Sequence, residues 1–279
     1  MTTAEVAGGR LLVCPTPIGN LQDVTLRVLE ALREADLLAC EDTRHTRLLL
    51  DRHGVADASL ISLHEHNERA RARELVGRMR AGALVALVSD AGMPLVSDPG
   101  FALLHECLAE GIPVEVLPGP SAVTTALVAS GLPAERWLFV GFLPRKRAEL
   151  QRLLAGAQDT LVAFESPRRL AATLATLAAV DPQRRAAVCR ELTKLHEEVR
   201  RGQAAELASH YEQHQARGEV VLVVDAAPPG AVSREQAAAA LRELVDAGAR
   251  ARPAAAVLAR LTGVAANELY RELTTDEGQ

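Results

Sequence analysis

Aromatic residues are scarce in this chain, with one Trp, two Tyr and four Phe among 279 residues. Aliphatic side chains must therefore fill the core, and little is left for stacking on bases, so any recognition of RNA has to rest on shape and charge. No apolar run approaches the ~20 residues that a membrane-spanning helix needs. The first ten residues also lack the basic and apolar stretches of a secretory signal. We expect a cytoplasmic protein.

Two kinds of chemical motif are also missing. The four cysteines are far apart and form no CxxC pair, which predicts reduced, mostly buried thiols and argues against a zinc site. Neither GxGxxG nor GxxxxGK[ST] occurs, so the chain lacks the signatures of a dinucleotide-dependent oxidoreductase and of a P-loop protein. The cysteines are Cys14, Cys40, Cys107 and Cys189.

Positive charge is concentrated in the middle of the chain, although the net charge is −5. Residues 136–201 contain 13 Lys and Arg against 7 Asp and Glu, a local charge of +6, so the remainder carries −11. Such a segment is typical of a localised RNA-facing surface. A solvated helix face with scattered arginines is an equally good interpretation of charge alone.

The first half alternates short apolar runs with amphipathic stretches, among them residues 25–33 and 68–79. Strand and helix in alternation predict an α/β fold with a mostly parallel sheet covered by helices, whose site lies beyond the carboxyl ends of the strands. The predicted strands are residues 11–14, 37–40, 60–63, 84–89 and 114–117.

A second α/β set follows the break at Gly131-Leu132-Pro133, and because it mixes closely spaced strands with helices, its sheet need not be all parallel. Its predicted strands are residues 137–140, 160–164, 186–190, 198–200 and 220–224, with helices over 170–180 and 203–213. We expect three domains: residues 1–132, residues 133–228 and a C-terminal helical module, residues 229–279.

The tail after Ala226–Gly230 has no strand pattern and predicts three helices. Ser233 with Gln236 resembles a capping box, and Ala254–Thr274 has the helix, glycine turn, helix spacing of a helix-turn-helix. Two interpretations stay open for this module: it docks on nucleic acid, or it only packs as a small bundle.

Three predicted strands end in loops suited to a ligand. Pro15–Asn20 makes an abrupt turn, Ser89–Gly100 is polar and glycine-broken, and Pro118–Ala122 opens a helix with unpaired N–H groups. Within the second loop we expect Asp90 to face the ligand and Asp98 to cap the helix beginning near Pro99.

Eight segments in order closely resemble the small-subunit ribosomal RNA methyltransferase I family, the 2′-O-methylating branch of the tetrapyrrole methylase superfamily. Each segment is weak evidence alone, but their shared order and spacing over residues 10–274 are specific. They are Pro15–Asn20, Glu41–Thr46, His64–Glu68, Ser89–Gly100, Pro118–Ala122, Gly141–Lys146, Glu165–Pro167 and Arg190–Lys194.

The resemblance implies a two-domain tetrapyrrole-methylase-like fold with S-adenosylmethionine in the cleft between the domains. It also implies a homodimer and, as substrate, a cytidine 2′-hydroxyl in the decoding region of 16S ribosomal RNA. The cofactor contacts that it implies are Pro17, Ile18, Ser89, Asp90, Gly92, Met93, Ser121, Ala122, Glu165 and Leu192.

A ribose hydroxyl needs help to lose its proton, and the candidates lie at strand ends. We predict Glu165 with Lys194 as base or hydroxyl orienter, supported by Arg44. Glu41 or Asp42 can instead cap the helix near Thr43, and His64 with His66 lacks a third ligand for a metal. The remaining candidates are Arg190 and Glu191.

Contact with RNA is predicted for three basic clusters, which would make affinity fall steeply with salt. Two other functions compete: a methylase of tetrapyrrole-type small molecules, and a ribosome-assembly factor without catalysis. The clusters are Arg145-Lys146-Arg147, Arg168-Arg169 and Arg200-Arg201.

Overall fold

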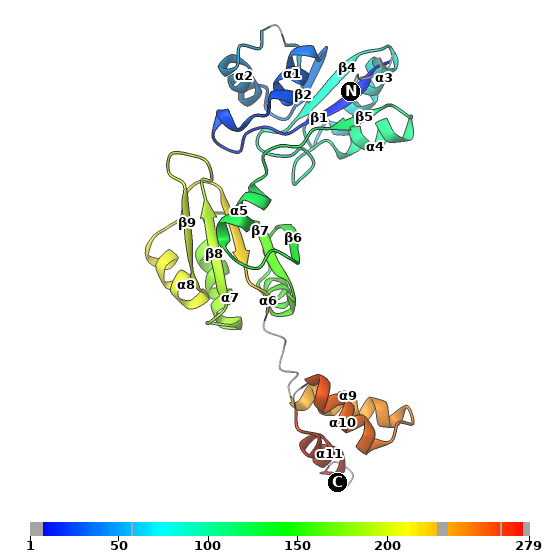
Figure 1. Ribbon diagram of the computed structural model, residues 1–279, viewed down its shortest axis with the longest axis vertical. Helices are drawn as coiled ribbons and strands as arrows, with labels where there is room; N and C mark the ends of the chain where they lie inside the picture. The colour runs from blue at the N-terminus through cyan, green and yellow to red at the C-terminus, as the bar shows by residue number, and fades with distance from the viewer. Residues whose placement is uncertain (1–7, 57, 228–233, 263, 276–279) are drawn as a thin grey trace. The chain divides into compact units, whose positions relative to one another are not determined.

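The computed structural model describes residues 8–56, 58–227, 234–262 and 264–275 (Figure 1). Two compact units are present. One comprises the chain up to Ala155 together with Asp159–Asp225, and the other comprises Gly156–Gln158 and the chain from Ala226 onward. The larger unit holds both β-sheets, and the smaller one is helical.

The first sheet is parallel throughout, with strand order β3-β2-β4-β1-β5, as the sequence predicts. Its predicted strands are confirmed, and their ends differ by at most one residue. The strands are β1 (Arg10–Cys14), β2 (Leu37–Cys40), β3 (Leu60–Ser62), β4 (Leu84–Val88) and β5 (Val114–Val116).

Helices cover both faces of this sheet (Figure 1). Leu12 and Cys14 of β1 pack with α1 (Leu26–Glu34) and α2 (Thr43–Arg52), whereas Leu11 and Val13 pack against the opposite layer. Because the sheet is buried on both faces, the sequences of its strands are continuous apolar runs. The opposite layer consists of α3 (Glu68–Arg80) and α4 (Phe101–Ala109), and the short 3-10 helix η1 (Leu21–Asp23) precedes α1.

The second sheet is mixed, with order β6-β7-β10-β8-β9. Strands β6 and β7 are parallel and the other neighbours are antiparallel, a pairing that the close spacing of these strands allows. The strands are β6 (Trp137–Phe142), β7 (Thr160–Glu165), β8 (Arg185–Arg190), β9 (Glu198–Gln203) and β10 (Val220–Val224).

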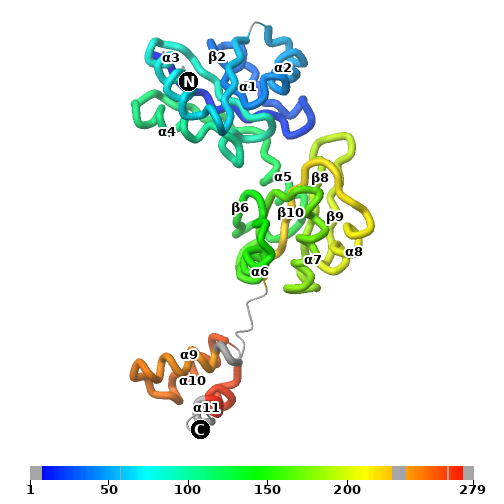
Figure 2. Tube along the Cα trace, turned by 180° about the vertical axis from the view of Figure 1, so that it is seen from behind, coloured from blue at the N-terminus to red at the C-terminus, as the bar shows by residue number. Residues whose placement is uncertain are grey.

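One face of this sheet packs on α6 (Arg147–Gly156), α7 (Leu170–Val180) and α8 (Ala204–Gln213) (Figure 2). The other face packs on α5 (Ala122–Ser130), whose Val123, Ala126 and Leu127 share a cluster with strand residues. The predicted domain boundary at Leu132 stays a prediction, and the helix just before it belongs with the second sheet.

The helical unit confirms the three predicted tail helices: α9 (Arg234–Asp246), α10 (Ala251–Thr262) and α11 (Ala266–Thr275). They share a small core that includes Leu241, Ala255 and Leu269. Ser233 of the predicted capping box and Gly263 of the predicted turn lie outside the described residues. Over the described part of the chain, no helix is both long and apolar enough to cross a bilayer.

Helix α4 corrects one prediction. It begins at Phe101 with Gly100 as its N-cap residue, and Asp98 does not cap it. Instead, the Glu68 carboxylate on α3 accepts the backbone N–H groups of Gly100 and Ala102, at 2.9 and 2.7 Å. A carboxylate from a neighbouring helix therefore satisfies the free donors that Asp98 was expected to meet.

Candidate functional site

The loops after β1 and β4 are tied together. Thr16 and Gly92 exchange backbone hydrogen bonds of 2.9 Å in both directions, and the Thr16 hydroxyl donates to the carbonyl of Ser89. The Ser89 hydroxyl donates in turn to the carbonyl of Gly92. These contacts fix the two loops as one rigid edge beyond the first sheet.

The loop after β5 joins that edge. Gly92 has a positive φ of 82°, and a Cβ built on it would lie 3.4 Å from Ile18 Cγ2 and 3.8 Å from the Pro120 carbonyl oxygen. Glycine suits this position because it adopts the positive φ without strain, and the short distances show that Ile18 and Pro120 pack directly against it. Three strand ends therefore converge at one place, as a parallel sheet predicts for a binding site.

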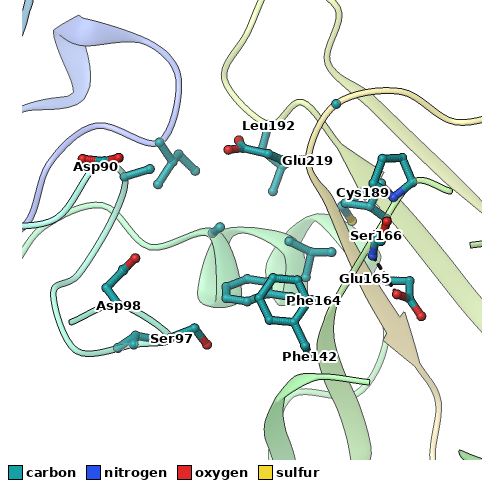
Figure 3. Close-up of a pocket in the computed structure, with 18 of the residues that line it drawn as sticks. Asp90, Ser97, Asp98, Phe142, Phe164, Glu165, Ser166, Cys189, Leu192 and Glu219 are labelled. Atoms are coloured by element: carbon teal, nitrogen blue, oxygen red, sulfur yellow. Dashed lines mark hydrogen bonds between the residues drawn. The ribbon is translucent and has the colours of Figure 1, made fainter. Parts of the chain in front are cut away.

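A cavity of about 440 Å³ opens beside this edge (Figure 3). Its size falls in the range of small-molecule sites. One side comes from the first sheet's loops and the other from the ends of β7, β8 and β10. The lining residues are Ile18, Glu41, Asp90, Ala91, Val96, Ser97, Asp98, Ala122, Phe142, Phe164, Glu165, Ser166, Pro167, Cys189, Leu192 and Gly218–Val221.

Three carboxylates gather on the first-sheet side of the cavity: Glu41, Asp90 and Asp98. Burial, together with the negative charges of Glu41 and Asp90, raises the pKa of Asp98 to about 7. Burial and the charge of Asp90 also raise the pKa of Glu41. Carboxylates gathered in this way create a site that favours a cation.

Five of the predicted cofactor contacts line the cavity: Ile18, Asp90, Ala122, Glu165 and Leu192. The other five lie outside the lining. Ser89 and Gly92 brace the loops through the hydrogen bonds above, and Met93 packs against the core of the first sheet. Pro17 and Ser121 flank lining residues in the chain.

Glu165 lies at the wall with its carboxylate turned to its own neighbours (Figure 3). It accepts the Ser166 N–H at 2.6 Å, the Arg169 Nε–H at 2.8 Å and the Thr173 hydroxyl at 2.6 Å. Its side chain is 0% exposed. Arg169 also donates to the Leu143 carbonyl, so the pair joins the ends of β6 and β7.

Lys194 and Arg44 each have partners of their own. Lys194 Nζ lies 2.9 Å from Glu191 and 2.7 Å from Glu219. Arg44 is exposed and pairs with Asp42, which accepts from the Arg44 backbone N–H and so caps α2 as one interpretation predicts. The contacts found here do not join Glu165, Lys194 and Arg44 into one group, and their catalytic roles stay predictions.

Some of the predicted RNA contacts also have partners within the protein, and others do not. Arg169 is bound inward by Glu165, and Arg201 donates to the carbonyls of Ala129 and Ser130 at the end of α5. Arg200 pairs with Glu198, and Lys146 with Glu149. Of the seven predicted contacts, those that are exposed with neither an ion pair nor a hydrogen bond to the described residues are Arg145, Arg147 and Arg168.

A loop after β8 reaches across to the loop after β1. Glu191 and Thr193 have positive φ values of 51° and 65°, an uncommon conformation for residues with side chains. The Thr193 hydroxyl accepts the backbone N–H of Asn20 at 2.9 Å. A Cβ on Gly19 would lie only 2.5 Å from Lys194 Cγ, so this approach requires glycine.

Sequence reasoning missed several lining residues. Phe142, Phe164 and Gly218–Val221 lie in or next to strands of the second sheet. The local sequence pattern predicts these strands, but it does not predict which of their residues line a cavity. Asp98 was assigned to a helix cap, although it follows the same strand as Asp90. Its place in a polar loop beyond a parallel strand was the available signal.

The family model described as Tetrapyrrole (Corrin/Porphyrin) Methylases matches residues 10–208. Uroporphyrin-III C-methyltransferase from Thermus thermophilus, solved with S-adenosyl homocysteine, superposes with a TM-score of 0.56 at 22% identity, covering 78% of this chain and 97% of that one. Diphthine synthase has a TM-score of 0.62 at 19% identity, with 78% and 90% covered. The class is that of the tetrapyrrole methylases.

Proteins similar in sequence show which family of this class the chain belongs to. A ribosomal RNA small subunit methyltransferase I of Micromonospora olivasterospora is 44% identical over 275 residues, which is 96% of this chain and 88% of that one. The protein of that name from Mesorhizobium japonicum is 46% identical over 270 residues, with 94% and 90% covered. The chain belongs to the ribosomal RNA small subunit methyltransferase I family.

Proposed function

We propose that this protein transfers a methyl group from S-adenosylmethionine to the 2′-hydroxyl of a cytidine in the decoding region of 16S ribosomal RNA. The reaction would take place in the cytoplasm, on RNA or on the small ribosomal subunit. The observation that carries the methyl-transfer part is the cavity, whose acidic side and apolar walls are built from loops of a methylase fold.

The cavity residues fit this cofactor. S-adenosylmethionine combines a flat apolar base with a sulfonium and an ammonium group, so it needs apolar walls and negative charge. Ile18, Ala122 and Leu192 supply apolar surface, and Asp90 and Asp98 supply the charge. Burial, and after it the charges of Glu41 and Asp90, raise the pKa of Asp98, and a bound cation would favour its ionised form.

The bound cofactor supplies an electrophilic methyl group. The protein's own residues bind it, exclude water and hold the acceptor oxygen in line with it, and such positioning can contribute roughly 7–11 kcal/mol. Ile18 and Leu192 share one apolar cluster with the α5 face of the second sheet, so both sides of the cavity rest on a fixed core.

The RNA surface is proposed to include Arg145, Arg147 and Arg168, whose guanidinium groups have no ion pair in the described part of the chain. Exposed, uncompensated arginines can neutralise phosphates without first breaking an internal contact. The paired Lys146, Arg169, Arg200 and Arg201 contribute if RNA displaces their partners. A homodimer is part of the same proposal.

The test is transfer of radiolabelled methyl from S-adenosylmethionine to three acceptors: small ribosomal subunits lacking the modification, large subunits, and a uroporphyrin-type tetrapyrrole. We expect label only on the small subunit. Label on the tetrapyrrole would support the small-molecule methylase, and cofactor binding with no label on any acceptor would contradict the proposal.

A further inference from the structure

An exposed histidine lies next to a carboxylate on the acidic side of the cavity, outside the lining itself. His45, in the first turn of α2, places Nδ1 3.3 Å from Oδ2 of Asp90. We propose that His45 accepts the proton of the ribose 2′-hydroxyl and that Asp90 orients it. This inference rests on the proposed function, and it assigns a residue that sequence reasoning did not consider.

The carboxylate that orients His45 is itself fixed. Oδ1 of Asp90 accepts the backbone N–H of Asp42 at 3.0 Å. Asp42 caps α2, and its own carboxylate is held by the Arg44 guanidinium. Asp90 therefore fixes both the start of the helix and the ring on its first turn.

A carboxylate oxygen accepts hydrogen bonds, so the neutral ring donates through Nδ1 and carries its lone pair on Nε2. Within the described residues, Nε2 has no hydrogen-bond partner, and the side chain is 62% exposed. A base held by a carboxylate at one nitrogen and open at the other is the arrangement that hydrolytic triads use.

The proton and electron balance is simple. Nε2 takes the proton of the 2′-hydroxyl while the ribose oxygen forms a bond to the methyl carbon. The carbon–sulfur bond breaks, and its electron pair stays on sulfur. The resulting imidazolium is stabilised by Asp90 and then releases its proton to water. General-base assistance of this kind contributes roughly 10²–10⁴-fold in rate.

The three groups predicted from the sequence are less suited to accept a proton. Both Glu165 oxygens already accept hydrogen bonds. Burial opposes the charge on Lys194, but hydrogen bonds to Glu219 and Glu191 outweigh it and raise the pKa of the ammonium. The Asp42 carboxylate raises the pKa of the Arg44 guanidinium.

Glu41 is the competing base because it lines the cavity itself, whereas His45 reaches the lining through Asp90. The full-length variants His45→Ala and Glu41→Gln separate the two assignments. We expect His45→Ala to lower kcat by about 10²-fold or more. Its Kd for S-adenosyl homocysteine and for small subunits should stay within about twofold. Added imidazole should restore part of the lost rate in His45→Ala and none in Glu41→Gln.

His105→Ala is the matched control, because His105 lies on α4 and stacks on the exposed Phe101. It should leave kcat unchanged, with or without imidazole. A readout independent of activity is the nitrogen NMR spectrum of the His45 ring. We expect the neutral ring to carry its proton on Nδ1, and Asp90→Asn to reduce that preference.

Three results would overturn the inference: normal kcat in His45→Ala, a loss explained by weaker binding, or a neutral ring protonated on Nε2. An active wild type with an unaffected His45→Ala contradicts this inference alone. A wild type that binds the cofactor but methylates no small subunit contradicts the proposed function, and the assignment of His45 as a ribose base falls with it.

Discussion

At the scale of single residues, Asp98 is the carboxylate whose ionisation the cavity controls most. Burial and the charges of Glu41 and Asp90 raise its pKa to about 7. A bound cation favours the ionised form, so cofactor affinity should fall as the pH drops through about 7. Binding at that pH should release a proton, which calorimetry in buffers of different ionisation enthalpy detects.

Asp98→Asn removes that charge at every pH. We expect the Kd for S-adenosylmethionine to rise about 10- to 100-fold, from the roughly 1.5–3 kcal/mol that a hydrogen bond to a charged group contributes, and to become less dependent on pH. Asp246→Asn, on the exposed end of α9, is the control and should change neither. Unchanged affinity in Asp98→Asn would contradict the cation-binding account.

Arg169 is the residue on which the buried Glu165 depends. Arg169→Ala leaves that carboxylate without its ion pair at a fully buried position. Removing one partner of a buried pair costs roughly 3–5 kcal/mol, and the 30% exposure of the Arg169 side chain puts the loss toward the lower end. Urea unfolding measures it, with the exposed Arg168→Ala as control. Equal stability of the two variants would refute a structural role for this pair.

At the scale of elements, the loop after β1 and the loop after β8 meet at Gly19. A Cβ there would lie 2.5 Å from Lys194 Cγ and 2.9 Å from the Leu192 carbonyl oxygen. Gly19→Ala should therefore push the loops apart and move Ile18 and Leu192, which line the cavity.

We expect Gly19→Ala to weaken cofactor binding at least about tenfold, equivalent to about 1.4 kcal/mol, as measured by calorimetry. Gly77→Ala is the matched control, because Gly77 lies within α3 and a Cβ there meets nothing within 4 Å. It should stabilise the helix slightly and leave binding unchanged. Normal cofactor affinity in Gly19→Ala would show that the contact between these loops does not shape the cavity.

The elements themselves were largely predictable, because continuous apolar runs mark strands buried on both faces. The partner of α5 was not: Ala122–Ser130 is apolar on nearly all sides, so its pattern points to no particular sheet. At the start of α4, the backbone N–H groups donate to Glu68 and not to the predicted Asp98. This contact joins two helices, so no local spacing in the sequence reveals it. The strand-end rule pointed to loops that line the cavity, but the bonds that occupy Glu165 and Lys194 depend on tertiary structure.

At the scale of the whole molecule, every residue that lines the cavity belongs to the larger unit. Deleting residues 226–279 should therefore leave the Kd for S-adenosyl homocysteine within about twofold of that of the full chain, because the truncated protein keeps every residue that lines the cavity. Thermal unfolding of the truncated protein shows whether the larger unit stays folded. A folded truncation that no longer binds the cofactor would show that the helical unit takes part in the site.

The identity of the methylated atom tests the central claim most directly. Small subunits lacking the modification are labelled with radioactive S-adenosylmethionine, their RNA is digested, and the labelled nucleotide is mapped and separated by position of the methyl group. The account predicts label on the ribose 2′-oxygen of a single cytidine of 16S RNA in the decoding region. Label on a base atom, or spread over many nucleotides, would contradict it.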